Sequence, residues 1–112
     1  MPQLSVRAYS PVTHHVSHLL GEMIAVARRQ RHMTASDLAK RAGISRTTLR
    51  KIETGDLKCE MGLVFEVATL VGVHLFEGDS RTLDLIQENL QAKLTLLPHR
   101  IRLQTKEVDD EF

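Results

Sequence analysis

The alternation of apolar and polar residues along the chain predicts a helical protein. Apolar residues recur at intervals of three and four, which is the period of an amphipathic helix. The predicted helices cover about residues 14–31, 35–42, 46–53, 63–71 and 83–97. The fourth is the most apolar and is expected to be the buried helix of the domain. A short apolar segment follows it at residues 73–76 and is expected to pack as a lid or strand.

The ends of the second and third predicted helices carry strong sequence signals. Thr34 is a candidate N-cap, and Asp37 stands three residues further on, as in a capping box with Asp in place of Glu. Gly43 supplies a residue that can take the left-handed conformation at a helix end. Ser45 is a candidate N-cap for the third helix. Two short helices joined by a tight turn are therefore expected between residues 34 and 53.

This pair of helices fits the requirements of a helix-turn-helix unit, whose second helix offers its first residues to the major groove of DNA. Ala39 is small enough for the two helices to approach closely, and Ile44 can fill the turn. Leu49 and Ile52 have the spacing of an inward face. The remaining positions of the predicted helix at residues 46–53 are polar and free to contact DNA.

The run from Met33 to Gly55 resembles the XRE (Cro/C1-type) helix-turn-helix family, including its ending Ile52-Glu53-Thr54-Gly55. The resemblance covers about residues 17–76 and implies an all-α, five-helix, lambda-repressor-like domain. It also implies a sequence-specific regulator that binds double-stranded, pseudo-palindromic operators as a homodimer, with Glu53 in a structural role.

The same resemblance assigns roles to individual residues. The expected base readers are Arg46, Thr47 and Lys51, because an arginine fork suits guanine and a threonine methyl suits thymine. The expected backbone or flanking contacts are Thr34, Lys40, Arg41, Ser45, Thr48, Arg50 and Lys58. A basic stretch at residues 28–32 can either interact with the negative end of the dipole of the first helix or contact DNA phosphates.

Charge is divided unevenly along the chain, although the 112 residues have a formal net charge of only +1. Residues 1–58 hold ten basic and four acidic side chains, whereas residues 59–112 hold five basic and ten acidic ones. This division suggests a nucleic-acid face and a separate acidic region. Aromatic residues make up only 4% of the chain, which argues against a base-stacking platform and favours a duplex.

The predicted fifth helix carries a continuous apolar row. Its members Leu83, Ile86, Leu90 and Leu94 are the candidate dimerisation residues. Packing against the first helix of the same chain explains the row equally well, and both arrangements can hold at once. The expected organisation is an N-terminal arm (1–11), a DNA-binding domain (12–78), this helix (79–98) and a charged flexible tail (99–112).

The tail carries a second, narrower resemblance. Its sequence Leu97-Pro98-His99-Arg100-Ile101-Arg102 and its acidic ending before Phe112 are similar to those of HipB-type antitoxins. Such antitoxins neutralise a HipA-like kinase toxin and repress the promoter that they share with it, and Phe112 is the candidate contact to the toxin. The alternative is a stand-alone regulator whose tail binds another protein or only improves solubility. A third possibility is a protein-interaction module that does not bind DNA.

Other functions have little support in the sequence. No nucleophile with its base, glycine-rich phosphate loop or pair of carboxylates suggests an enzyme, and no cofactor is expected. His14, His15 and His18 have a spacing that can bind zinc, but no acid or cysteine completes a site, so no metal is expected. Cys59 is the only cysteine, and no apolar run is long enough to span a membrane. A cytoplasmic protein is therefore expected.

Overall fold

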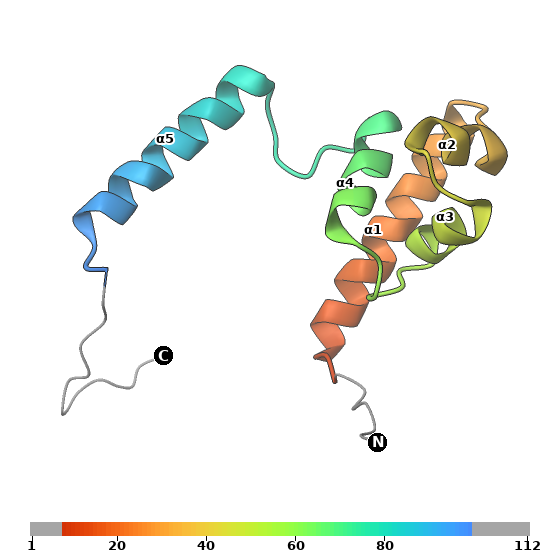
Figure 1. The fold of residues 1–112 in the computed structure, drawn as a ribbon, viewed down its shortest axis with the longest axis horizontal. Coiled ribbons are helices and arrows are strands. Elements are labelled where there is room, and N and C mark those ends of the chain that lie inside the picture. Colours follow the sequence, from red (N-terminus) through yellow and green to blue (C-terminus); the bar gives the residue numbers. More distant parts are fainter. Residues whose placement is uncertain (1–7, 100–112) are drawn as a thin grey trace. The chain divides into compact units, whose positions relative to one another are not determined.

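A computed structural model describes residues 8–99, which contain five helices (Figure 1). The helices are α1 (Pro11–Gln30), α2 (Ala35–Ala42), α3 (Arg46–Glu53), α4 (Met61–Leu70) and α5 (Ser80–Leu96). No strand occurs in this part of the chain, so the predicted all-α fold is confirmed. The chain divides into two compact units, residues 1–75 and 76–112. The predicted contact residue Phe112 lies outside the described residues.

α1 begins three residues earlier than the sequence pattern suggested. Ser10 is its N-cap, and its hydroxyl accepts a hydrogen bond of 3.4 Å from the Thr13 backbone N–H. Pro11 occupies the first turn, where its fixed φ suits a helix and its missing N–H costs nothing. The apolar pattern alone does not reveal this start, because neither Ser10 nor Pro11 belongs to that pattern.

α1 packs closely against the end of α3. A Cβ placed on Gly21 would lie 2.5 Å from the backbone oxygen of Glu53, so only glycine fits at this crossing. The Ser17 hydroxyl donates a 2.7 Å hydrogen bond to the carbonyl of Gly55, whose φ of 83° also favours glycine. These contacts fix α3 along α1.

One hydrophobic core joins α1, α2, α3 and α4. Its members are buried and come from all four helices and the residue after α4: Ile24, Leu38, Ala39, Leu49, Ile52, Val67, Ala68 and Val71. The close-packed Ala39 predicted for α2 and the inward positions Leu49 and Ile52 predicted for α3 are therefore confirmed.

Two expectations about the region after α3 are wrong. α4 is not a buried helix, since only Val67 and Ala68 of its ten residues are buried, and Phe65 is exposed. The segment after α4 forms no strand, and Val73 alone of its apolar residues packs against the core, whereas Leu75 and Phe76 are exposed to 42% and 66%. A high apolar content indicated burial, but α4 lies at the surface of a small domain and presents one face only.

The second unit contains α5. Asp79 caps this helix by accepting a 3.0 Å hydrogen bond from the Thr82 backbone N–H, which lowers the pKa of the Asp79 carboxyl. Pro98 follows the last residues of the helix, as predicted. No residue of α5 is buried, so its apolar row is left without a partner within this unit.

Candidate nucleic-acid interface

The turn between α2 and α3 has the geometry that the sequence predicted. Gly43 ends α2 with a φ of 71°, in the left-handed region. The backbone N–H of Ile44 returns to the carbonyl of Ala39 at 3.0 Å, and Ile44 packs against the core. The turn is thereby closed, and α3 starts in a fixed direction relative to α2.

Ser45 sets the start of α3. Its hydroxyl accepts a 3.0 Å hydrogen bond from the backbone N–H of Thr48 and lies 3.0 Å from the Thr48 hydroxyl. Both hydroxyls that were expected to flank DNA therefore already hold the helix end together. Each retains acceptor capacity for a further partner.

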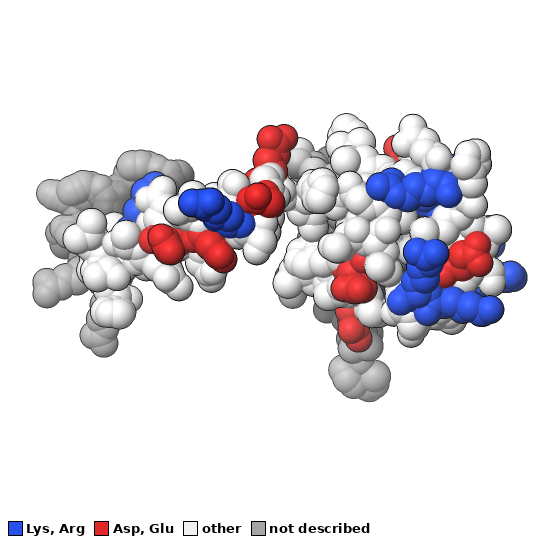
Figure 2. All heavy atoms as spheres, turned by 90° about the horizontal axis from the view of Figure 1, so that it is seen from above, with Lys and Arg blue, Asp and Glu red and all other residues white. Residues whose placement is uncertain are grey.

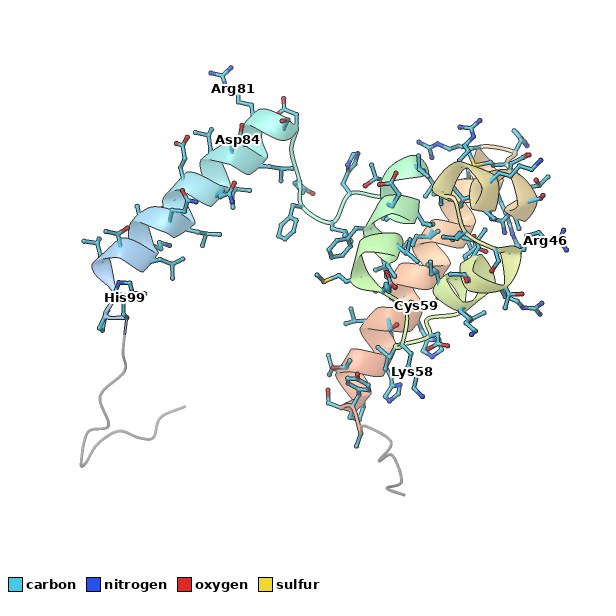
Figure 3. All side chains as sticks on the ribbon, viewed as in Figure 1. Arg46, Lys58, Cys59, Arg81, Asp84 and His99 are labelled. Carbon is cyan, nitrogen blue, oxygen red and sulfur yellow. The ribbon has the colours of Figure 1, made fainter. Side chains whose placement is uncertain are left out.

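The opposite side of α3 is open to solvent. Because Leu49 and Ile52 are buried, the helix turns Arg46, Thr47 and Lys51 outward, and all three are exposed. Figure 3 shows Arg46 pointing away from the core at the edge of the domain. Three side chains with the chemistry to contact base edges thus share the exposed side of one helix.

A groove of about 500 Å³ runs beside α3. Four arginines from α1 and α3 line it together with other side chains. The full lining is Arg28, Arg29, Ala35, Arg46, Thr47, Leu49, Arg50, Glu53 and Thr54. The structure therefore brings Arg46, Thr47 and Arg50 together with Arg29 from the end of α1. Lys51 does not line this groove. Arg29 is an exposed member of the basic stretch for which the sequence left two interpretations open.

Arg28 belongs to the same stretch but has a different role. It is 8% exposed, and its Nε and Nη2 donate hydrogen bonds of 2.7 and 3.0 Å to the two carboxylate oxygens of Glu53. A third bond of 3.0 Å reaches the carbonyl of Met33. The bond to Glu53 raises the pKa of Arg28. This residue is occupied in tying α1 to α3 and is not free for phosphate, and the structural role expected for Glu53 is confirmed.

The capping box at the start of α2 is complete. The Thr34 hydroxyl accepts a 3.0 Å bond from the Asp37 backbone N–H, and the Thr34 backbone N–H donates to the Asp37 carboxylate at 3.3 Å. These bonds lower the pKa of Asp37 below its ordinary value. The start of α2 is thereby ordered.

We expect Thr34→Ala to destabilise the domain by about 1 kcal/mol through loss of this cap. The pKa of Asp37 should rise toward its ordinary value in the variant, since its hydrogen bond to the cap is weakened. Because the pKa of Asp37 is lower in the folded protein than in the unfolded chain, its carboxylate stabilises the fold at pH values above its ordinary pKa. This stabilisation is lost as the pH falls through the lowered pKa of the folded protein. NMR titration of Asp37 in both proteins measures this shift, and an unchanged Asp37 titration would contradict the role of the cap.

The remaining predicted contacts surround α3. Lys40 and Arg41 are exposed on the last turn of α2, and Lys58 is exposed in the loop after α3. The backbone N–H of Lys58 donates to the Asp56 carboxylate at 2.8 Å, which orders that loop. Figure 2 shows Lys and Arg side chains gathered over the part of the domain that carries α2 and α3, with acidic side chains among them. Figure 3 places Lys58 in the loop, apart from Arg46.

Neither of the other chemical candidates gains support. No group of three or more metal-binding side chains occurs in the described part of the chain. Burial raises the pKa of the Cys59 thiol, which disfavours its thiolate form. None of the helices in residues 8–99 is long and apolar enough to cross a membrane.

Comparison with known families agrees with this geometry. A family model described as Helix-turn-helix matches residues 24–77, which run from Ile24 in α1 through α4 to the first two residues of the second unit. Searches of curated proteins and of solved structures give no match. Residues 24–77 therefore form a helix-turn-helix domain, a class of DNA-binding regulatory domain. This match supports a DNA-binding transcription regulator of the XRE type.

Proposed function

We propose that the protein is a sequence-specific repressor that reads double-stranded operator DNA with the exposed side of α3. Arg46, Thr47 and Lys51 contact base edges. The surrounding groups Thr34, Lys40, Arg41, Ser45, Thr48, Arg50 and Lys58 hold the sugar-phosphate backbone. The observation that carries the proposal is the outward placement of Arg46 and Thr47 on a helix whose other side is buried, next to a groove lined by arginines.

Selection of bound fragments from a random duplex library tests this proposal. A repressor of this kind enriches one pseudo-palindromic sequence, because each half-site meets the same helix of a twofold dimer. The selection also supplies the operator sequence and the half-site spacing. A library that remains random, at a salt concentration where the protein still binds DNA, would contradict sequence-specific recognition.

Lys58→Ala separates backbone contact from base reading. We expect this variant to bind operator and unrelated duplexes with affinities reduced by similar factors. The slope of log affinity against log salt should fall by about one, because one fewer counterion is released. Titration of both duplexes at several salt concentrations measures the two effects. A loss confined to the operator would instead assign Lys58 to base recognition.

We propose further that the protein binds operators as a homodimer through the apolar row of α5, which contains Leu83, Ile86, Leu90 and Leu94. The support is that all four side chains are exposed, from 39% for Ile86 to 67% for Leu94. A single short helix makes few contacts with DNA, and twofold pairing doubles them. Sedimentation of the purified chain tests this, and a Leu90→Glu variant should sediment as the monomer.

We also propose that the regulator is the antitoxin of a HipA-like kinase toxin and represses the operon that encodes both. The support is the sequence of the tail, with its basic start, its acidic ending and Phe112. The toxin is expected to co-purify with the full chain and to be lost when residues 99–112 are deleted. The matched control is DNA binding, which the deletion should leave intact. Full neutralisation of the toxin by the shortened chain would contradict the role of the tail and favour a stand-alone regulator.

A further inference from the structure

α1 has a second apolar side that the domain core does not use. Five of its residues form this outer stripe of α1, with exposed fractions from 46% to 70%: Val12, Val16, Leu19, Met23 and Val26. Their spacings of four, three, four and three residues are those of the a and d positions in a heptad repeat. This spacing is typical of a helix that packs along another helix.

The outer stripe lies on the opposite side of α1 from the core. The buried residues of α1 are Gly21, Ile24 and Arg28, and at 100° per residue their side of the helix faces away from the stripe. Within the first unit, Val73 reaches the edge of the stripe, beside Met23 and Val26, where a hollow of about 320 Å³ remains. An apolar row of this length on a small domain marks an interaction surface.

α5 carries an apolar row of the same length. Val12 and Val26 at the ends of the outer stripe of α1 are 14 residues apart, as are Leu83 in α5 and Leu97, the C-cap residue of that helix. Each is therefore about 21 Å long at the rise of an α-helix. Leu83, Ile86, Leu90, Leu94 and Leu97 are all exposed. Each chain thus presents two apolar rows of equal length, neither of which is covered within its own unit.

We infer that the outer stripe of α1 is the docking surface for α5 of a second copy of this chain. The inference deepens the proposed homodimer and rests on it, since it names the surface that α5 meets. Pairing of α1 with α1 alone, or of α5 with α5 alone, would leave the other row in water. Pairing within one chain would cover both rows but leave neither for dimerisation. If α5 of each chain packs on α1 of the other chain, the dimer has two symmetry-related contacts. Each contact covers the five side chains of one outer stripe and the five side chains of one α5 row, which suits an isologous dimer.

Disulfide formation between the midpoints of the two rows tests this arrangement. Leu19 and Leu90 are the middle residues, so they lie opposite each other whether the helices run parallel or antiparallel. Leu19→Cys and Leu90→Cys are made separately in a Cys59→Ser background, with one of the two chains isotope-labelled. After mixing and mild oxidation without DNA, mass spectrometry should find mainly the mixed disulfide dimer, with each variant alone giving little.

Each other outcome overturns the inference. A disulfide dimer of Leu19→Cys alone would show that α1 pairs with α1, and one of Leu90→Cys alone that α5 pairs with α5. A chain with both substitutions that forms its disulfide internally would show that α5 covers its own domain. No disulfide in any sample would show that the two rows do not meet. Glu88→Cys, on the other side of α5, replaces Leu90→Cys as the matched control and should not cross-link.

The same proteins distinguish this inference from the proposed function. DNA binding by the Cys59→Ser parent is measured in parallel with the cross-link. Intact DNA binding without the mixed disulfide overturns the docking surface alone. The mixed disulfide without sequence-specific DNA binding overturns the proposed repressor function and leaves the docking surface standing.

Discussion

Replacing Arg28 by alanine should lower the free energy of unfolding of the first unit by about 3 to 5 kcal/mol. The guanidinium forms two hydrogen bonds with Glu53 and one with the Met33 carbonyl, and both charged side chains are almost fully shielded from water. Without Arg28, the largely shielded carboxylate of Glu53 is left without its partner. Urea denaturation followed by circular dichroism measures the loss.

Two controls separate this ion pair from a general effect of substitution in α1. Arg29→Ala removes an exposed arginine one residue away and should change stability by no more than about 0.5 kcal/mol. Arg28→Met combined with Glu53→Leu removes both charges and keeps the apolar volume, so it should recover most of the loss. If the double variant is as unstable as Arg28→Ala, the loss comes from packing and the proposed role of the pair is wrong.

The consequence for function follows from where the pair lies. Glu53 is the last residue of α3, and Arg28 is in the last turn of α1. Their bonds therefore fix the end of the helix that carries Arg46 and Thr47. A variant without this pair should lose DNA affinity even where the fold persists, because α3 no longer has one fixed direction.

The helix-turn-helix could be predicted from sequence because its signals are local. Thr34 with Asp37, Gly43, and Ser45 each determine the backbone within a few residues, and the structure confirms all of these caps. The exposed side of α3 follows equally directly from the burial of Leu49 and Ile52. The candidate base readers are therefore placed by local rules, while their contacts with DNA stay a prediction.

What the sequence could not supply depends on contacts between distant residues. Arg28 and Glu53 are 25 positions apart, so the basic stretch could not be divided into buried Arg28 and exposed Arg29. The apolar residues of α1 recur at helical intervals in the sequence, yet they belong to two sides of the helix. Only the position of the core separates Ile24 from Leu19 and so reveals the outer stripe.

Replacing Arg46 by alanine should weaken operator binding by about 1 to 3 kcal/mol, or about 5- to 150-fold, and relax the preference at one position of each half-site. The guanidinium can donate two parallel hydrogen bonds to the O6 and N7 of guanine, which alanine cannot replace. Because the side chain is exposed and outside the core, the stability of the domain should not change. Fluorescence anisotropy with the selected operator and a set of single-base variants measures both effects.

Arg46→Lys is the matched control for charge. Lysine keeps the positive charge but lacks the planar fork, so it should retain affinity for unrelated duplexes and still lose discrimination at the guanine. Recovery of full discrimination by Arg46→Lys would assign Arg46 to phosphate instead. Equal operator affinity of the wild type and Arg46→Ala would remove Arg46 from the interface. Recognition would then have to come from Thr47 and Lys51, whose substitution should in that case show the losses expected here.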